Sequence, residues 1–353
     1  MKGLALVEPG KVQYIEIERP TLQDSRGCIL KPLIVAPCTS DVHTIFDGGS
    51  KKRDNLILGH ESVCQVVEIG EDVKDFKVGD VVALPAITPL WDTLGIENGN
   101  YGHSFAPFSG HQLGRTINGV FEEFLYLPNA DKNLAHIPSN VTLEQALMCV
   151  DVVTTGFTCA EEAEIKIGDN IVVFGIGAIG LMAIQAAKLM GAARIIAVGT
   201  RRKSIELAKE YGATDIVNYK ECDVVSTIKA LNLFNGVDRV LICGGNDNTL
   251  RQAYDIANYG TSVISNVMMF TGSGDMPIPK FSGGKGMCGK TFKMTLAKGG
   301  RFRIEKLLNL VSVGRFNPEK LITDKLYGMD KILDGIYLMK ENNGETIKVA
   351  IYL

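Results

Sequence analysis

The residue types most capable of chemistry gather in two short motifs near the N-terminal end of the chain. Cys38, Ser40 and His43 form a C-x-S-x-x-H motif, and His60 and Glu61 follow in a G-H-E motif about twenty residues later. Thiolate, imidazole and carboxylate groups are ligands of zinc, and three protein ligands leave one coordination position open for a substrate. The hydroxyl and the second imidazole can pass on a proton near neutral pH. We therefore interpret these motifs as part of a catalytic metal site.

Length, charge and cysteine usage restrict the kind of protein. The chain has 353 residues, a formal net charge of −3 and no block of basic residues, which argues against nucleic acid or an anionic membrane as a partner. Its eight cysteines are scattered without a C-x-x-C pair, as expected in a reducing compartment. The N-terminus lacks the features of a signal peptide, and no run of about 18 apolar residues occurs. We therefore expect a cytoplasmic protein without a membrane span.

The elements that must position the motifs begin with a region rich in predicted strands. Apolar or alternating runs between turn residues indicate strands at 4–7, 12–17, 62–70 and 78–84, as in a small β-barrel. Residues 86–119 are rich in glycine and show little periodicity, so we expect a long lobe, after which a strand resumes at 120–126. A helix is predicted over 142–148, capped by Thr142 and leading to Asp151.

From about residue 155, apolar strands alternate with helices. Strands are expected at 170–174, 194–198, 213–217 and 237–242, and helices at 181–190 and 203–211. Such alternation is typical of a doubly wound α/β domain, in which both faces of a parallel sheet are buried. We place this domain at residues 155–294. A mainly β domain is expected at residues 1–154, and residues 295–353 are expected to return to it.

The first strand of the α/β region leads directly into a glycine-rich turn. That turn has the spacing G-x-G-x-x-G and consists of Gly175, Ile176, Gly177, Ala178, Ile179 and Gly180. Glycines at these positions let the turn tighten and let the backbone approach a pyrophosphate, which binds at the N-terminus of the following helix. The position of the turn between a strand and a helix predicts a dinucleotide site. A tight turn with nothing bound is the alternative.

The end of the second strand indicates which dinucleotide binds. An NAD site usually has an acidic residue there, which accepts a hydrogen bond from the ribose 2′-hydroxyl. This chain has Gly199, Thr200 and Arg201 instead, a combination suited to a 2′-phosphate. Tyr219, after the next strand, is placed to cover the adenine. We predict NADP(H) as the cofactor; Arg201 as a solvated surface charge is the alternative.

These motifs together carry a family resemblance. The order C-x-S-x-x-H, G-H-E, G-D-x-V and strand–GxGxxG–helix resembles that of the zinc-dependent medium-chain alcohol dehydrogenases. The stretches MKGLAL, APCTSDVHT, ILGHE, PAITP, DVVTTGF and GATDIVNYK are similar to the tetrameric NADP-dependent secondary alcohol dehydrogenases of anaerobic bacteria and protists, along nearly the whole chain. The resemblance implies a chaperonin-10-like (GroES-like) β-barrel catalytic domain, interrupted by a Rossmann NADP-binding domain, in a homotetramer.

The resemblance also implies the metal ligands. Cys38 and His60 match the first two ligands of a catalytic zinc ion, and Glu61 matches a carboxylate that either ligates zinc or swings away. The third ligand of the family stands four residues before the threonine of a Thr-Gly pair, a position that Asp151 occupies in this chain. Cys149 lies close by in sequence and is the alternative ligand.

The implied reaction is hydride transfer between an alcohol and the nicotinamide ring. In the family, zinc lowers the pKa of the alcohol, and the cofactor takes the hydride from the carbinol carbon. The proton is expected to leave through the Ser40 hydroxyl, by way of the cofactor ribose, to His43 at the surface. The alternatives are that Ser40 only orients a ligand and that His43 only contacts phosphate. The resemblance also assigns Asn266, Val267 and Met268 to the cofactor site.

Two departures from the family pattern bear on the metal content and on the substrate. The lobe at 86–119 contains no cysteine, whereas many relatives hold a structural zinc there with four, so we expect one catalytic zinc ion per subunit and no structural zinc. His111 stands where the close relatives have tryptophan, and Met268-Met269 stands where they have Asn-Tyr. An imidazole and flexible thioethers should widen or reshape the pocket. His111 could also hydrogen-bond a polar substrate.

We therefore predict a zinc- and NADP(H)-dependent oxidoreductase that acts on secondary alcohols and ketones, including ones bulkier than 2-propanol and acetone. A polyol dehydrogenase, or another alcohol or aldehyde dehydrogenase of the same family, is the nearest alternative. A zinc-free enone or quinone reductase of the same fold would lack the metal ligands. A non-catalytic NADP(H)-binding protein would not need Ser40 and His43 beside a complete ligand set.

Overall fold

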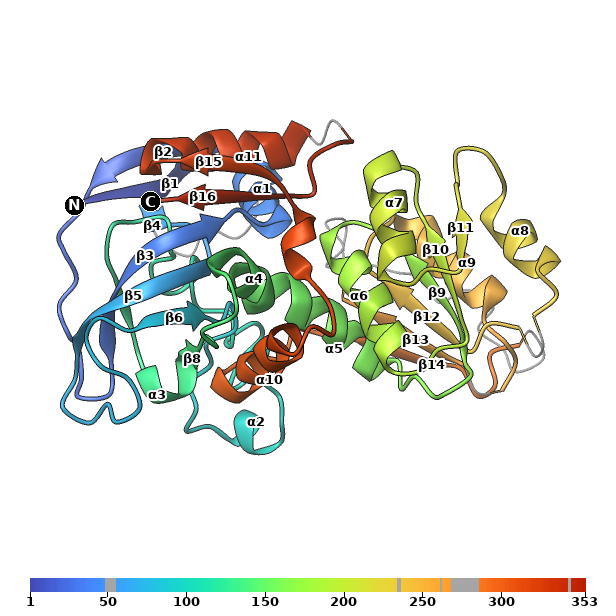
Figure 1. Cartoon of the computed structure of the whole chain (residues 1–353), viewed down its shortest axis with the longest axis horizontal. Helices are drawn as coiled ribbons and strands as arrows, with labels where there is room; N and C mark the ends of the chain where they lie inside the picture. The colour runs from blue at the N-terminus through green and yellow to red at the C-terminus, as the bar shows by residue number, and fades with distance from the viewer. Residues whose placement is uncertain (48–54, 234–235, 261, 268–285, 342–343) are drawn as a thin grey trace. The chain divides into compact units, whose positions relative to one another are not determined.

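The computed structural model describes residues 1–47, 55–233, 236–260, 262–267, 286–341 and 344–353 (Figure 1). The chain divides into two units, of which the first comprises residues 1–154 and 298–353 and the second comprises residues 155–297. The return of the chain to the first unit thus lies three residues after the position 295 that we expected from the sequence. Within the described residues, no helix combines the length and the apolar character needed to cross a membrane.

The first unit contains a large sheet built from strands that are far apart in the sequence. Its order is β15-β16-β3-β5-β6-β8, with β7 also paired to β3. The bounds are β3 Cys28–Ala36, β5 Glu61–Ile69, β6 Val81–Leu84, β7 Leu125–Leu127, β8 Ala135–His136, β15 Ile322–Tyr327 and β16 Lys348–Tyr352. A smaller sheet has the order β2-β1-β4, formed by Lys11–Glu16, Lys2–Glu8 and Leu56–Ile57. Apolar side chains from both sheets form one core.

The register around β3 brings three distant segments to one end of the sheet. In the antiparallel pairing of β3 with β5, Ala36 lies opposite Glu61, so the chain just after β3 meets the chain just before β5. On the other edge of β3, Ile351 of β16 lies opposite Val35. Continued along the strands, that antiparallel register brings Lys348 to the same end. Strand pairing therefore fixes which side chains can meet there.

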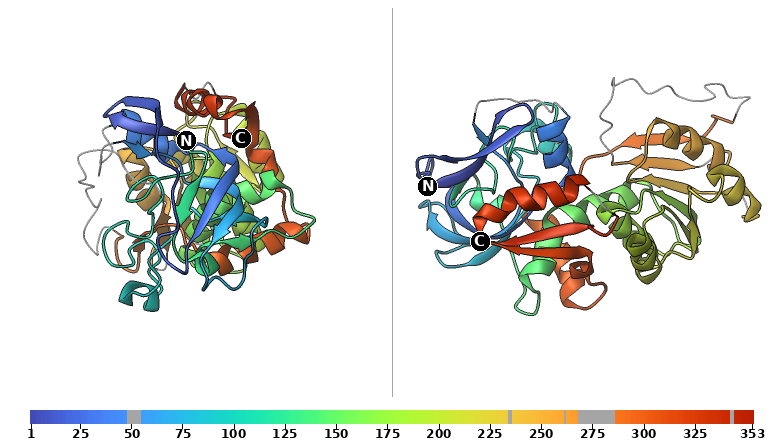
Figure 2. Two further views of the ribbon diagram at one scale, coloured as in Figure 1. Left: turned by 90° about the vertical axis from the view of Figure 1, so that its left-hand side faces the viewer. Right: turned by 90° about the horizontal axis from the view of Figure 1, so that it is seen from above.

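Helices complete the first unit. They are α1 Thr39–Phe46, α2 Leu94–Glu97, α3 Ala130–Asn133, α4 Leu143–Met148, α10 Arg301–Ser312 and α11 Ile332–Glu341. The last of these, red in Figure 2, packs against β16, where Gly335 faces the side chains of Val349 and Ile351. The predicted cap of α4 is confirmed, because the Thr142 side chain accepts a hydrogen bond from the Gln145 backbone.

The prediction of a strand at residues 120–126 is wrong for most of its length. Val120 and Phe121 are fully buried, but their backbone N–H groups donate to Gly59 O and Leu58 O, in a loop rather than in a regular ladder. Only β7 is a strand in this region. The apolar run was therefore a true signal of burial, and burial does not distinguish a strand from a loop that lines the core.

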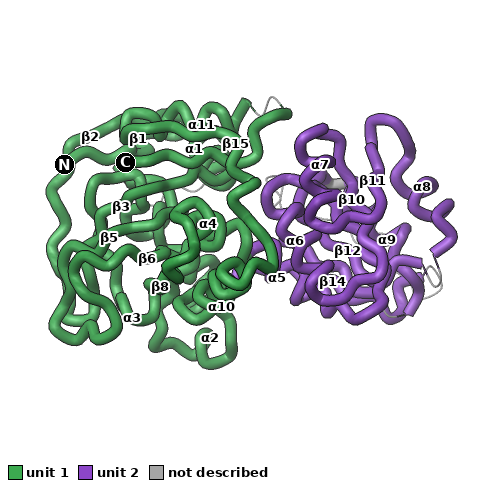
Figure 3. The backbone as a smooth tube through the Cα atoms, in the orientation of Figure 1, with its two compact units in different colours: residues 1–154, 298–353 green, residues 155–297 purple. Residues whose placement is uncertain are grey.

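The second unit, purple in Figure 3, contains a doubly wound α/β sheet. Its six parallel strands have the order β11-β10-β9-β12-β13-β14, in which the first strand of the unit, β9, is central. The strands are β9 Asn170–Phe174, β10 Arg194–Val198, β11 Asp215–Val217, β12 Arg239–Ile242, β13 Val263–Asn266 and β14 Thr291–Met294. The helices are α5 Thr154–Glu162, which begins at the last residue of the first unit, α6 Ala178–Leu189, α7 Arg202–Tyr211, α8 Val224–Ala230 and α9 Asp247–Ile256. In sheets of this order, ligands bind where the strand order reverses, beside the carboxyl end of the central strand.

Candidate metal centre and cofactor edge

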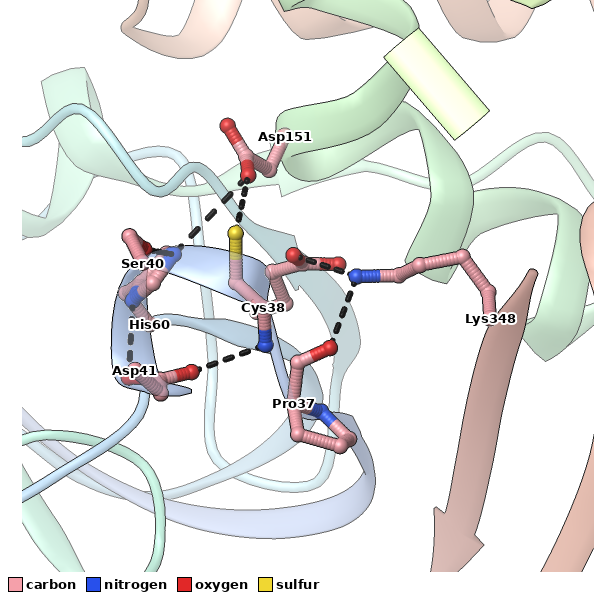
Figure 4. A network of polar contacts seen from close by, with 8 residues as sticks. Pro37, Cys38, Ser40, Asp41, His60, Asp151 and Lys348 are labelled. Carbon is pink, nitrogen blue, oxygen red and sulfur yellow. Dashed lines mark hydrogen bonds and ion pairs between the residues drawn. The ribbon is translucent and has the colours of Figure 1, made fainter. Parts of the chain in front are cut away.

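Four potential ligands, Cys38, His60, Glu61 and Asp151, converge at the end of the large sheet in the first unit. Figure 4 labels three of them, Cys38, His60 and Asp151. Cys38 lies between β3 and α1, His60 immediately precedes β5, and Glu61 begins that strand. Asp151 lies on a π-helical turn, Cys149–Val153, that separates α4 from α5. One ligand atom from each residue lies within 4.8 Å of those of the other three. Such π-helical turns occur frequently at functional sites, because they widen a helix locally and redirect a side chain.

The loop before β5 is shaped so that His60 faces this cluster. Gly59 has a φ of +89°, and a Cβ atom there would lie 2.6 Å from the buried Phe121 ring. A residue with a side chain would therefore be both strained and crowded at this position. The close packing of the loop on the core explains why a glycine precedes His60 in the G-H-E motif.

The spacing of the donor atoms fits a zinc ion. Cys38 Sγ lies 3.7 Å from Asp151 Oδ2, and His60 Nε2 lies 3.8 Å from the same oxygen. Tetrahedral zinc with bonds of about 2.0–2.3 Å requires ligand atoms roughly 3.3–3.8 Å apart. Glu61 Oε2 is buried and has no hydrogen-bond partner, a state that a nearby cation would relieve. The sulfur, nitrogen and oxygen donors and the orphaned oxygen together fit a divalent metal such as zinc.

The other oxygen of Glu61 is held by a buried lysine. Lys348 Nζ donates to Glu61 Oε1 at 2.6 Å and to Pro37 O at 2.9 Å, and the side chains of Lys348 and Glu61 are 3% and 0% exposed. Burial raises the pKa of Glu61 to about 7, although the Lys348 ammonium opposes this shift. Lys348 therefore fixes one oxygen of the carboxylate and leaves the other facing away from it.

Asp41 orients both of the first two ligands. Its Oδ2 atom accepts a hydrogen bond of 2.8 Å from the Cys38 backbone, and its Oδ1 atom lies 3.5 Å from His60 Nδ1. Burial alone would lower the pKa of His60, but the Asp41 carboxylate and the Cys38 side chain raise it well above the usual value. A carboxylate on the second nitrogen of a ligating histidine fixes the ring orientation and leaves the first nitrogen for the metal.

The two residues predicted to move a proton occupy different surroundings. Ser40 Oγ lies 3.5 Å from His60 Nε2, at the edge of the ligand cluster. His43 lies one turn further along α1, is 43% exposed in its side chain, and contacts Asp47 Oδ2 through Nδ1. Ser40 therefore lies at the ligand cluster, whereas His43 lies at the surface, where its ring contacts the Asp47 carboxylate.

Three residues that contact the predicted site residues were not identified from the sequence, which also left two alternatives for the third metal ligand. Asp41, Asp47 and Lys348 were not singled out, although a lysine at the start of an apolar strand is itself a signal of a buried ion pair. Cys149 is fully buried and lies outside the four-residue cluster, whereas Asp151 is part of it. Asp151 is the better candidate for the third ligand.

The glycine-rich turn of the second unit occupies the expected position between β9 and α6. A Cβ atom at Gly180 would lie 2.0 Å from Gly175 O, so only glycine permits this approach of helix to turn. Gly177 is the N-cap of α6 and offers no side-chain hydrogen bond to the helix. Backbone N–H groups at such a helix N-terminus are available to a phosphate.

The residues predicted to bind a 2′-phosphate lie beside this turn. A Cβ atom at Gly177 would be 3.4 Å from Nη2 of Arg201, and Thr200 Oγ1 donates to the Tyr219 hydroxyl at 3.5 Å. Burial lowers the pKa of Arg201, which nevertheless stays a cation. Tyr219 is 56% exposed, which leaves its ring accessible. Gly199 directly follows β10 and precedes these residues.

The remaining predicted cofactor residues lie at the end of β13. Asn266 is fully buried at the last position of this strand, and the Val267 backbone donates to Ile242 O at 3.2 Å. Both residues thus lie at the carboxyl edge of the parallel sheet, where ligands of this fold bind. Met268 and Met269 lie outside the described residues.

Known proteins resemble the chain along its whole length. Residues 25–139 match the family model of the alcohol dehydrogenase GroES-like domain, and residues 178–308 match that of zinc-binding dehydrogenases. The chain is 46% identical to the NADP-dependent isopropanol dehydrogenase of Thermoanaerobacter brockii, with 100% of both chains covered. It is 42% identical to the enzyme of the same name from Entamoeba histolytica, with 99% of this chain and 95% of that one covered.

Solved structures agree with these matches. The alcohol dehydrogenase TADH of Thermus sp. ATN1 superimposes with a TM-score of 0.88 at 26% identity, and the comparison covers 100% of this chain and 99% of the other. The predicted architecture, a GroES-like domain combined with a Rossmann-type parallel sheet, is thereby confirmed.

Proposed function

The chain belongs to the zinc-binding alcohol dehydrogenase family, and we propose that it oxidises secondary alcohols, or reduces ketones, with NADP(H) and one catalytic zinc ion per subunit. The observation that carries the proposal is the cluster of Cys38, His60, Glu61 and Asp151, two of them buried and two half-buried, whose ligand atoms all lie within 4.8 Å of one another. The relatives from T. brockii and E. histolytica, named for isopropanol and NADP, support the substrate class and the cofactor.

The ligand residues divide into a fixed set and an adjustable one. Cys38, His60 and Asp151 would hold the ion, and Glu61 would either complete its shell or withdraw toward Lys348. Zinc, when bound, would polarise the oxygen of the alcohol or ketone, and NADP(H) would accept or donate the hydride. Three fixed ligands with a mobile fourth would leave room for a substrate oxygen.

The proton is assigned to side chains of α1. We propose that Ser40 accepts it from the alcohol hydroxyl, because Ser40 Oγ lies at the ligand cluster. His43 would release the proton to solvent, since its ring is partly exposed and its Nδ1 atom contacts the Asp47 carboxylate. In ketone reduction the same groups would deliver a proton.

The cofactor is assigned to the edge of the second unit. The turn at residues 175–180 would hold the pyrophosphate, and Thr200 and Arg201 would hold the 2′-phosphate. Gly199 would allow close approach, and Tyr219 would cover the adenine. Asn266 and Val267 are proposed to line the site further along the edge; Met268, also assigned to the cofactor by the resemblance, lies outside the described residues.

The remaining expectations stay predictions. The absence of cysteine from residues 86–119 supports the lack of a structural zinc. A homotetramer rests on family resemblance, and a cytoplasmic location rests on the scattered cysteines, which are typical of a reducing compartment. A zinc-free reductase and a non-catalytic NADP(H)-binding protein are less favoured, because neither needs the buried donor cluster. A polyol dehydrogenase uses the same chemistry, and only turnover separates it from the proposal.

The test is a substrate panel combined with metal analysis. Purified protein should oxidise 2-propanol and 2-butanol with NADP⁺ far better than with NAD⁺, and should contain one zinc ion per chain. Sorbitol and primary alcohols serve as comparison substrates. Turnover of polyols alone would favour the polyol dehydrogenase, whereas zinc-free protein with reductase activity would overturn the proposal.

A further inference from the structure

His111 presents an unused polar atom beside the metal centre. Its ring packs edge-on against the ring of His60, with the centroids 4.7 Å apart and the planes at 83°. The Nε2 atom of His111 is buried and has no hydrogen-bond partner. The backbone holds the residue in place, because His111 N donates to Phe108 O at 3.1 Å and the next side chain, Gln112, donates to Thr88 O.

The other described histidines all have a defined partner. His43 and His60 face the carboxylates of Asp47 and Asp41. His103 Nδ1 accepts a hydrogen bond from a backbone N–H group, and His136 stacks on Phe76. A buried polar atom left without a partner lowers stability, so its presence next to a ligand cluster calls for a functional explanation.

The buried Nε2 atom of His111 can pair with either a donor or an acceptor on a bound molecule. One nitrogen of a neutral imidazole donates a hydrogen bond and the other accepts one, depending on the tautomer. A hydroxyl group can do both, so it satisfies Nε2 in either tautomer, whereas a carbonyl oxygen can only accept.

We infer that His111 determines substrate specificity by hydrogen-bonding a second oxygen of the substrate, so that vicinal diols and α-hydroxy ketones are preferred over plain secondary alcohols. The inference rests on the proposed function and names its substrate class. A substrate without the second oxygen leaves Nε2 buried and unpaired, and sites built around such a group discriminate strongly against the analogue that lacks it.

The test compares 2,3-butanediol with 2-butanol, which differ by one hydroxyl group. Both are oxidised with NADP⁺ by the wild type and by the variants His111→Phe and His111→Gln. The phenylalanine variant should lower the ratio of kcat/KM for the diol to that for 2-butanol by roughly 10- to 100-fold. The loss should fall mainly on the KM of the diol, because a bond to a non-reacting group is made equally in the ground and transition states.

A conservative variant and a matched control sharpen the result. His111→Gln keeps a donor and an acceptor and should retain most of the preference. His103→Phe makes the same exchange in the same lobe at an exposed position and should leave the ratio unchanged. If His111→Phe fails to fold, the wild type and the glutamine variant still test the inference. A wild-type KM for the diol above that for 2-butanol would overturn it.

Different results would overturn the role of His111 and the proposed alcohol dehydrogenase activity. Oxidation of 2-butanol by a folded His111→Phe variant with an unchanged ratio would overturn the role of His111 and leave the alcohol dehydrogenase intact. Failure of the wild type to oxidise either alcohol, despite bound zinc and NADP⁺, would overturn the proposed function and the role of His111 together.

Discussion

The metal centre and the cofactor edge are built in opposite ways. The four candidate ligands come from three separate stretches of chain. Their partner Asp41 lies in the same stretch as Cys38, and their partner Lys348 adds another distant strand. Strand register brings Cys38, Glu61 and Lys348 to one end of the large sheet, and Asp151 joins them from the π-helical turn after α4. The cofactor edge is local: a strand, a turn and a helix follow one another, and the end of the next strand lies beside the turn.

This difference predicts different consequences of mutation. Side chains at the metal centre depend on one another, because each buried charge is satisfied by a group from another segment. The cofactor edge depends on backbone geometry, and its phosphate-binding side chains are replaceable. Mutations at the metal centre should therefore abolish function or stability, whereas mutations at the cofactor edge should change the cofactor specificity.

The largest effect is expected from Asp151→Ala. Loss of this carboxylate should remove zinc from the purified protein and lower kcat/KM by at least about 10³-fold, since the metal contributes several kcal/mol to catalysis. Cys149→Ala is the matched control, two residues away and outside the cluster. Zinc content by mass spectrometry should fall in the first variant only; the reverse pattern would make Cys149 the ligand.

A large loss of stability is expected from Lys348→Met. The change leaves the buried Glu61 carboxylate without its partner. Removal of one member of a buried ion pair lowers the free energy of unfolding by about 3–5 kcal/mol. Denaturant unfolding of the metal-free protein measures this loss. The double variant Lys348→Met with Glu61→Gln removes both charges and should regain most of the stability. An equal loss in both variants would show that the lysine acts only through packing.

A change of specificity is expected from Arg201→Ser. The ratio of kcat/KM with NADPH to that with NADH should fall by about 10- to 100-fold, because a charge-assisted hydrogen bond to the 2′-phosphate is lost. Arg202→Ser is the control, since the neighbouring side chain is 81% exposed and pairs with Glu206. An unchanged ratio in the first variant would restore the alternative that Arg201 is a surface charge.

The smallest effect concerns the ion pair of Arg194 and Asp215 at the neighbouring strands β10 and β11. Hydrogen bonds from Arg194 hold the pKa of Asp215 below its usual value. A lowered folded-state pKa contributes stability above the unfolded pKa of about 3.9, and this stability is lost as the pH falls through the folded-state pKa. Both side chains are partly exposed, so the effect is at most about 1 kcal/mol. Arg194→Met should flatten the fall of Tm between pH 5 and 3; an unchanged slope would refute the pairing.

The same contrast explains what the sequence could predict. The turn at residues 175–180 and the C-x-S-x-x-H motif are visible because spacing along the chain reports local geometry directly. Lys348 could not be assigned to Glu61, because their meeting depends on the pairing of β16 with β3, which no local pattern encodes. The π-helical turn at Asp151 was equally hidden, since the predicted helix covered only residues 142–148 and no local pattern marks a π-helical turn after it.

The most direct test of the metal centre is X-ray absorption spectroscopy at the zinc edge of the purified protein. The account predicts one sulfur neighbour per zinc at about 2.3 Å, from Cys38, and nitrogen or oxygen neighbours at about 2.0–2.2 Å. Two sulfur neighbours would place Cys149 on the metal in addition to Cys38. A spectrum without any sulfur neighbour would contradict the site itself.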